Sequence, residues 1–264
     1  MITLIATLTI SAQTIRVYEY DGNNNLNSTP SFTSSNKVKV VFTEGTDPEV
    51  EHEYVDLGLP SGTLWATCNI GAESPSEKGL FFAWGDIEGH PEGYDFSWNN
   101  YKFYGGISFN PNSMYKMTKY WFQNADGGGD YNTILDYSDD AAYMIWGHGW
   151  EMPTVLQLEE LMRCCYWEFT ANYNGTGVSG CIVYKAKSDE DRGKSNINNN
   201  LNNTYVLSDK HIFFSTGAYW SRNLHLGAKP EDYHANPLSV LNNKVIVPSA
   251  FRCEGLMIRP VRFK

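Results

Sequence analysis

The sequence has no cluster of lysine and arginine residues, and its formal net charge is −10, with 20 basic and 30 acidic residues. Nucleic acids and anionic membranes are bound largely through basic patches. We therefore expect neither as a partner. Beyond the N-terminus, no apolar run approaches the roughly 20 residues that a membrane-spanning helix needs. The composition predicts a protein that does not insert into a membrane.

The motifs that carry metal or nucleophile chemistry are also missing. The five cysteines contain no C-x-x-C spacing, which argues against a zinc site, and the six histidines form no H-E-x-x-H. No G-x-S-x-G elbow positions a serine nucleophile. Two pairs of neighbouring acids, Asp139 with Asp140 and Glu159 with Glu160, are better explained as helix residues than as a glycosidase pair. We expect no cofactor and no catalytic residues, so the chain is predicted not to be an enzyme.

The first residues are typical of a secretory signal. An apolar run from Ile2 to Ile10 is too short to span a bilayer and is followed by the small residues Ser11 and Ala12. We expect residues 1–12 to be cleaved, so that the mature chain begins at Gln13 in the periplasm, at the cell surface or outside the cell. No basic residue precedes the run, however, and the alternative is a buried first strand.

Residues 13–53 are expected to form a small N-terminal element. Residues 14–20 and 37–43 alternate apolar and polar side chains and contain many β-branched and aromatic residues, which predicts two strands of a β-hairpin. Residues 44–53 are acidic and contain glycine and proline, as a linker does. The main domain is expected from residue 54 to residue 264.

Two helices are predicted in the main domain. Ser138 is expected to cap the first, which runs to about Trp146 and stops at Gly147. Thr154 and Gln157 form a capping box for the second. Its expected buried stripe consists of Leu158, Leu161, Met162 and Cys165. Trp167 is expected near the end of this helix, packed in the core. Five further tryptophans are expected in the core, namely Trp65, Trp84, Trp146, Trp150 and Trp220.

Short strands are predicted on either side of the two helices. Residues 54–66 give two strands around a Pro-Ser-Gly turn, residues 80–84 give another, and residues 256–263 give the last. Pro260 requires that this last strand lie at a sheet edge or a bulge. Because strands and helices do not alternate regularly, the fold class is predicted to be α+β with much loop.

Six ordered segments resemble a known family, the Fibrobacter succinogenes major paralogous domain, which is abundant in exported proteins of Bacteroidetes. They are residues 54–72 (YVDLGLPSGTLWATCNIGA), 82–85 (FAWG), 138–142 (SDDAA), 146–154 (WGHGWEMPT), 219–221 (YWS) and 258–261 (IRPV). The family is similar to C-type-lectin-like domains. The resemblance implies two helices, a small twisted antiparallel sheet and long loops, and a surface or secreted binding module without catalytic residues.

The chain departs from the family pattern at several positions. Glu151 stands where the family usually has a basic residue, and the segment 221–253 has no counterpart that we can place. C-type lectins bind sugar through calcium held by Glu-Pro-Asn or Gln-Pro-Asp and Trp-Asn-Asp. The corresponding segments here, 235–237 (ANP) and 220–223 (WSRN), lack the acids that calcium requires. We therefore expect binding that does not depend on calcium.

The binding face is predicted in the C-terminal segment from Tyr219 to Cys253, which shows no periodicity that would bury one side. Long aperiodic loops on a rigid scaffold are frequent recognition sites. The candidate ligand-binding residues are Tyr219, Arg222, His225, Asp232, Tyr233, His234 and Asn236. The simpler interpretation is a solvated loop with no role, and a metal site at His225, Asp232 and His234 is a weaker alternative.

The predicted function is therefore calcium-independent binding of a glycan or a protein. Two alternatives belong to other classes of protein. One is a display scaffold whose residues 221–253 vary, as in the C-type-lectin-like targets of diversity-generating retroelements. The other is a structural surface subunit that exchanges strands through the N-terminal hairpin.

Export also allows disulfides. We expect Cys68 to pair with Cys164 or Cys165, and the sequence does not decide between the two. Closing a loop of about 100 residues would stabilise the fold by roughly 4–5 kcal/mol in the chain-entropy model.

Overall fold

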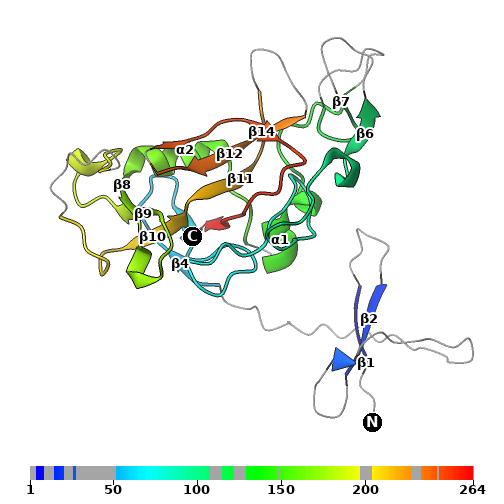
Figure 1. Ribbon diagram of the computed structural model, residues 1–264, viewed down its shortest axis with the longest axis horizontal. Helices are drawn as coiled ribbons and strands as arrows, with labels where there is room; N and C mark the ends of the chain where they lie inside the picture. The colour runs from blue at the N-terminus through cyan, green and yellow to red at the C-terminus, as the bar shows by residue number, and fades with distance from the viewer. Residues whose placement is uncertain are drawn as a thin grey trace, which may run out of the picture. The chain divides into compact units, whose positions relative to one another are not determined.

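The computed structural model describes residues 52–107, 115–121, 129–147, 149–196, 204–226, 233–242 and 244–263, together with three strands nearer the N-terminus. The chain divides into two compact units, Met1–Glu49 and Val50–Lys264. The division falls close to the domain boundary expected between residues 53 and 54. Figure 1 shows both units. In the described residues, no helix is both long and apolar enough to cross a bilayer.

The first unit contains an antiparallel sheet with the strand order β1-β2-β3. Its strands are β1 (Leu4–Leu8), β2 (Ile15–Tyr20) and β3 (Leu26–Asn27). β2 agrees with the first expected strand, whereas residues 37–43 lie outside the described residues. β1 falls within the apolar run expected to be a signal. Cleavage after Ala12 stays a prediction.

In the second unit, the first two strands and the last one share a sheet with the order β15-β5-β4. The strands β4 (Tyr54–Val55) and β5 (Thr63–Ala66) flank the predicted Pro-Ser-Gly turn. The strand β15 (Val261–Phe263) pairs with β5 in the register Val261 to Trp65. Pro260 directly precedes β15, which is an edge strand, as proline requires.

The described residues of this unit form three other antiparallel sheets (Figure 1). The sheet β10-β9-β8 contains β8 (Cys165–Thr170), β9 (Gly180–Lys185) and β10 (His211–Ser215). In a four-stranded sheet, β12 (His234–Val240) pairs with β11 (Gly217–Leu224), β13 (Val245–Ile246) and β14 (Ala250–Phe251). A two-stranded ribbon joins β6 (Tyr104–Ile107) and β7 (Tyr115–Met117).

The two helices are α1 (Ala141–Trp146) and α2 (Val155–Cys164). The capping box of α2 is confirmed, because the Thr154 side chain accepts from the backbone N–H of Gln157 and the Gln157 side chain accepts from that of Thr154. The expected cap of α1 is wrong. Its N-cap is Asp140, whose carboxylate accepts from the N–H groups of the next turn, while Ser138 lies in a preceding 3-10 turn. The unit is thus a mixed fold of two helices and several small antiparallel sheets, as an α+β class requires.

Trp167 is buried near the end of α2, as expected, and it lies in β8 because the chain turns directly from helix to strand at Cys165. One other expectation about local structure is wrong. The segment 221–253 is not an aperiodic loop, since much of it forms β11, β12, β13 and β14. In β11 the consecutive residues Trp220, Ser221 and Arg222 are all buried. A strand covered on both faces shows no alternation, which explains the misleading pattern.

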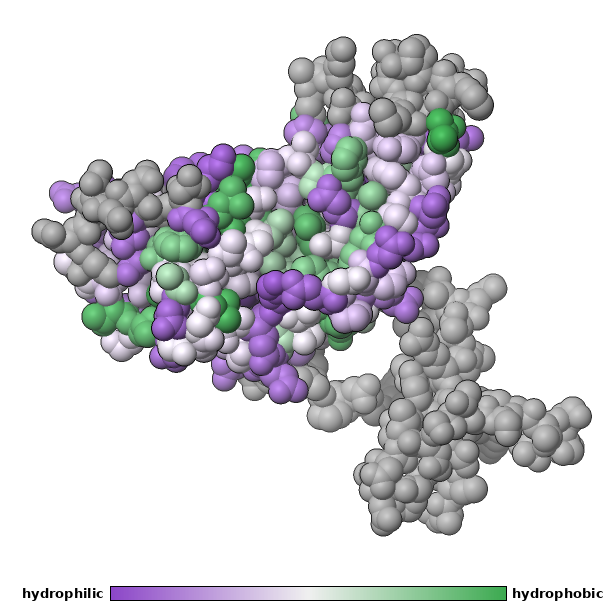
Figure 2. Space-filling model, in the orientation of Figure 1, coloured by the Kyte–Doolittle hydropathy of each residue, from purple (hydrophilic) through white to green (hydrophobic). Residues whose placement is uncertain are grey.

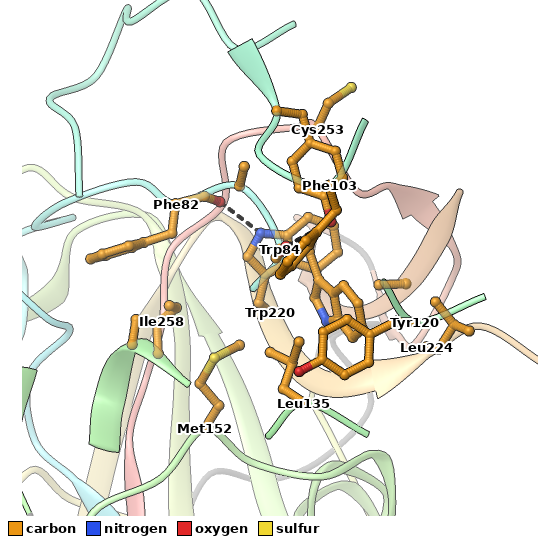
Figure 3. Close-up of a cluster of buried hydrophobic side chains, with 14 of the residues drawn as sticks. Phe82, Trp84, Phe103, Tyr120, Leu135, Met152, Trp220, Leu224, Cys253 and Ile258 are labelled. Carbon is orange, nitrogen blue, oxygen red and sulfur yellow. Dashed lines mark hydrogen bonds between the residues drawn. The ribbon is translucent and has the colours of Figure 1, made fainter. Parts of the chain in front are cut away.

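The largest group of buried side chains surrounds Trp84 and Trp220 (Figure 3). The indole N–H of Trp220 donates to the Phe82 carbonyl oxygen at 2.8 Å, so the ring is buried without an unpaired donor. Four of the five tryptophans expected in the core are buried, and Trp146 is half-buried. On the face shown in Figure 2, strongly hydrophobic residues are scattered among pale and purple ones.

The five cysteines are free thiols in the structure. Neither of the expected pairings of Cys68 is formed. Cys165 and Cys181 lie in the core against α2, whereas Cys68 lies beside a surface hollow described below. The fold is therefore held together here by packing and hydrogen bonds.

Candidate functional site

Two of the predicted ligand-binding residues point into the protein. Tyr219 is 1% exposed, and its hydroxyl donates to the Ser215 carbonyl oxygen at 2.8 Å. Arg222 is 7% exposed. Both lie in β11, which has neighbours on each face, so both side chains are committed to internal contacts.

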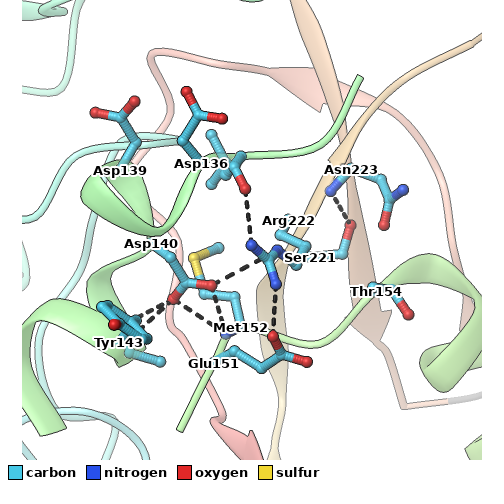
Figure 4. Close-up of polar contacts among 12 residues, drawn as sticks. Asp136, Asp139, Asp140, Tyr143, Glu151, Met152, Thr154, Ser221, Arg222 and Asn223 are labelled. Atoms are coloured by element: carbon cyan, nitrogen blue, oxygen red, sulfur yellow. Dashed lines mark hydrogen bonds and ion pairs between the residues drawn. The ribbon is translucent and has the colours of Figure 1, made fainter. Parts of the chain in front are cut away.

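Arg222 is the centre of a buried polar cluster (Figure 4). Its guanidinium donates to Glu151 Oε2 at 2.6 Å and to the Leu135 carbonyl oxygen at 2.7 Å, and its Nε lies 3.7 Å from Asp140 Oδ2. Burial raises the pKa of Asp140, although the Met152 N–H and Arg222 act in the opposite direction. Glu151 is thus paired with Arg222.

The structure brings the other described candidates together at one end of the β11–β12 hairpin. The backbone N–H of His225 donates to the His234 carbonyl oxygen at 3.0 Å. The Asn236 amide donates to His225 Nδ1 and to the Pro248 carbonyl oxygen, both at 3.0 Å. Tyr233 lies against His234, with ring centroids 4.5 Å apart. Asp232 lies outside the described residues.

These residues adjoin a set of aromatic rings at the surface, which we call the outer aromatic cluster. Its members are Trp98, Tyr104, Tyr115, Tyr233, His234 and Phe251. The rings of Trp98 and Tyr115 are stacked at 4.4 Å, and those of His234 and Phe251 at 4.6 Å. Tyr233 joins the two halves, because its centroid lies 5.4 Å from Tyr115 and 6.1 Å from Phe251. The contacts therefore form one continuous cluster.

Local backbone geometry explains why the rings share a face. His234 and Phe251 are directly opposite in the β12–β14 pair, and opposite residues in an antiparallel pair project to the same side. The β6–β7 register shifts between Tyr104 and Ile107, where Gly106 has a φ of 103°. A bulge of this kind redirects side chains, and it leaves the ring centroids of Tyr104 and Tyr115 6.1 Å apart.

The outer aromatic cluster is open to solvent on one side. Phe251 is 40% exposed, and Ile107 next to the cluster is 70% exposed. The other five members are half-buried. Aromatic rings that keep an exposed face while their backs are packed are rigid, which lowers the entropy lost when a ligand binds.

A second set of rings lies deeper and encloses a cation. We call it the inner aromatic box, which consists of Trp84, Tyr101, Phe103 and Tyr120 around the guanidinium of Arg252. The guanidinium carbon is 4.7 Å from the Trp84 centroid. The Arg252 side chain donates to Tyr101 Oη at 2.8 Å, to the Tyr120 carbonyl oxygen at 2.9 Å and to the Lys119 carbonyl oxygen at 3.0 Å. Arg252 is fully buried, so the box is filled by the protein itself.

A hollow of about 180 Å³ lies near the start of the unit. Its walls include His52, Glu53, Thr67, Cys68, Glu73 and Trp146. His52 is stacked on Trp146 with centroids 3.7 Å apart, and partial burial lowers the pKa of its imidazole. In the part of the chain that the structure describes, no group of three His, Cys, Asp or Glu residues is arranged to hold a metal ion.

Three thiols are poorly suited to nucleophilic chemistry. Burial raises the pKa of Cys165 and of Cys181 to about 12 and that of Cys253 to about 11. A thiol attacks as its thiolate, and these groups are protonated at neutral pH.

Sequence reasoning missed four of the six rings of the outer aromatic cluster, namely Trp98, Tyr104, Tyr115 and Phe251. One signal was present. Residues 94–104 (YDFSWNNYKFY) hold six aromatic residues, most of which alternate with polar ones. Such a segment supplies more rings than a local core can bury, and in the structure it contributes to both the inner box and the outer cluster.

Comparison of the chain with protein-family models, with curated proteins and with solved structures gave no match.

Proposed function

We propose that the chain is an exported, non-catalytic binding module that takes a glycan or protein ligand at the outer aromatic cluster. The observation that carries the proposal is the convergence of six rings from separate segments onto one solvent-facing surface. Aromatic residues with an apolar body and a polar tip are enriched in binding sites. Of the ligand-binding residues predicted from the sequence, the proposed binding face includes His225, Tyr233, His234 and Asn236. It excludes Tyr219 and Arg222, which are buried.

The fold that we propose is C-type-lectin-like, as the resemblance implies. The two helices and the small antiparallel sheets support it. Calcium independence is supported by the two segments that would correspond to the lectin ligand set. Asn223 Oδ1 accepts from the Val155 N–H at 2.8 Å, so this oxygen is already engaged within the protein. Pro237 pairs with Trp220 inside the sheet.

Export is supported by the apolar run followed by Ser11 and Ala12. Intact-mass analysis of the protein recovered from its native host tests this part. The expected N-terminus is Gln13. Retention of Met1 in the protein found outside the cytoplasm would contradict it.

The test of the proposed function is capture of ligands on a glycan and protein array by the chain without residues 1–12. The wild-type protein is compared with Phe251→Ala and with Phe263→Ala, which removes a ring of similar exposure (54%) from the edge strand β15. The proposal predicts that Phe251→Ala loses the captured ligand while Phe263→Ala retains it. Equal capture by both variants, with folding intact, would contradict it.

A variable display scaffold is the second candidate, and one observation restricts it. Within residues 221–253 the core positions Leu224, Ala235, Leu238 and Val240 are 2% exposed or less. Variation compatible with folding is therefore confined to half-buried and exposed positions such as His225, Tyr233 and His234, which adjoin the same aromatic surface. Sequencing of sibling genes distinguishes the two functions, because a scaffold requires adenine-directed changes at these positions.

A further inference from the structure

We propose that the outer aromatic cluster binds an uncharged glycan, whose pyranose rings stack on Trp98 and Phe251. The inference rests on the proposed function and names the ligand class for the same surface. Pyranoses with mostly equatorial hydroxyls present a flat face of C–H groups and a rim of hydroxyls. An aromatic ring flanked by hydrogen-bonding groups is complementary to both parts.

The shape of the cluster favours such a ligand. The Trp98 and Tyr115 rings are inclined by 30°, and the His234 and Phe251 rings by 23°. Trp98 and Phe251 meet edge to face, with centroids 6.0 Å apart and planes at 76°. The surface is thus made of two stacked pairs set at a steep angle. Two such pairs suit successive sugar rings of a twisted chain better than one extended flat ligand.

Hydrogen-bonding groups lie at the edge of this surface. The Asn236 amide nitrogen donates to His225 Nδ1, so that nitrogen is an acceptor and the imidazole proton is on Nε2. The His225 ring lies 6.5 Å from that of His234. Among the described residues, no hydrogen bond uses His225 Nε2 or Asn236 Oδ1. One donor and one acceptor are therefore available to sugar hydroxyls beside the cluster.

Charge supports an uncharged ligand. The chain has a net charge of −10. Glu254 lies at the border of the cluster, where its carboxylate accepts from the Phe251 N–H at 3.2 Å. A uronate or a sulfated sugar would meet like charge there. A hydrophobic peptide segment is the competing ligand for an aromatic surface, and the experiment below distinguishes it from a glycan.

Binding of soluble polysaccharides to the chain without residues 1–12, measured by isothermal titration calorimetry and affinity electrophoresis, tests the inference. The probes are neutral β-glucan, xyloglucan, glucomannan and mannan, with polygalacturonate as the anionic counterpart. We expect at least one neutral polysaccharide to bind and polygalacturonate not to bind. Phe251→Ala is expected to weaken binding at least tenfold, Phe251→Tyr to restore it to within about threefold, and Phe263→Ala to leave it unchanged.

The outcomes separate the two proposals. If no neutral polysaccharide binds and the array identifies a protein ligand lost in Phe251→Ala, the proposed function stands and the glycan inference is wrong. If a neutral polysaccharide binds equally to wild type and to folded Phe251→Ala, the surface assignment is overturned. Because Phe251→Tyr keeps the ring, a loss of binding in both position-251 variants despite native melting would also contradict stacking as the mechanism.

Discussion

The inner aromatic box and the outer aromatic cluster contain the same aromatic residue types but differ in what the rings contact. In the box, Trp84, Tyr101, Phe103 and Tyr120 surround Arg252, which is fully buried and hydrogen-bonded on all sides of its guanidinium. In the cluster, the rings stack on one another and one side faces solvent. Trp98 connects the two sets, because its ring lies edge-on to Tyr101 at 5.8 Å.

The difference shows what distinguishes packing from recognition in an aromatic-rich protein. An aromatic cage whose cation belongs to the same chain stabilises the fold and has no room for a ligand. A set of rings that is packed from behind and exposed in front has surface left to contribute to binding. Mutations in the first should therefore change stability, and mutations in the second should change affinity.

The largest loss of stability is expected for Arg252→Met. The substitution removes three charge-assisted donors and leaves the Tyr120 and Lys119 carbonyl oxygens without them, so we expect a loss of about 4 kcal/mol in the free energy of unfolding. Urea unfolding measures it. The control is Arg262→Met, since Arg262 lies over Tyr54 and Trp150 near the surface. A loss below about 1 kcal/mol for Arg252→Met would show that the box does not depend on its cation.

Arg222→Ala is expected to cost about 3 kcal/mol in the free energy of unfolding, because it leaves the buried carboxylate of Asp140 and the half-buried carboxylate of Glu151 without their cation. At temperatures where the variant remains folded, ligand capture should be unchanged. Glu151→Gln, which keeps the side-chain shape, should cost less. If Arg222→Ala retained full stability and lost binding, Arg222 would belong to the ligand site, as the sequence alone had suggested.

Asp139 provides a pH-dependent test of the scaffold. Burial alone would raise the pKa of Asp139, but hydrogen bonds from Lys119, Lys102 and Tyr120 outweigh it and hold the pKa below its usual value of 3.8. A carboxyl group whose pKa is lowered in the folded state stabilises the protein at pH values above its unfolded-state pKa. This contribution is lost as the pH falls through the folded-state pKa.

We expect Asp139→Asn to cost about 2 kcal/mol at pH 7, the typical worth of hydrogen bonds to a charged group. The difference in the free energy of unfolding between the wild type and the variant should disappear as the pH falls below about 4. Unfolding curves from pH 7 to pH 2.5 measure both quantities. A gap that stayed constant, or that widened on acidification, would contradict the assigned direction of the pKa shift.

Phe251→Ala should have the smallest effect on stability. Its ring is 40% exposed, so we expect a loss of about 1 kcal/mol or less. Thermal melting beside Phe263→Ala, whose ring is similarly exposed, tests this. A loss as large as that of Arg252→Met would place Phe251 in the core and would remove the distinction between the two aromatic sets.

The parts of the fold that the sequence predicted are those decided by local chemistry. The capping box at Thr154 and Gln157 needs only four neighbouring residues, and it is present. The cap of α1 is decided by tertiary contact instead. Asp140 accepts not only from the N–H groups of Ala142 and Tyr143 but also from that of Met152, twelve residues later. That additional donor is not visible in a local pattern.

The candidate site was harder to predict, because its rings come from distant segments. Trp98 and Phe251 belong to opposite halves of the chain, and their rings meet edge to face at 6.0 Å only once the chain has folded. The predicted residues His225, Tyr233, His234 and Asn236 adjoin the surface that we propose. Tyr219 and Arg222 are buried. The sequence did not show this, because a strand buried on both faces has the same irregular pattern as a loop.

The most direct test of the central claim is a paired measurement on one variant. The melting temperature and the dissociation constant of Phe251→Ala are determined together, with whichever ligand the wild-type protein captures. The account predicts a melting temperature close to that of the wild type and an affinity at least tenfold weaker, which corresponds to about 1.4 kcal/mol. A variant with unchanged affinity and a strongly lowered melting temperature would contradict it, because the outer aromatic cluster would then be part of the scaffold.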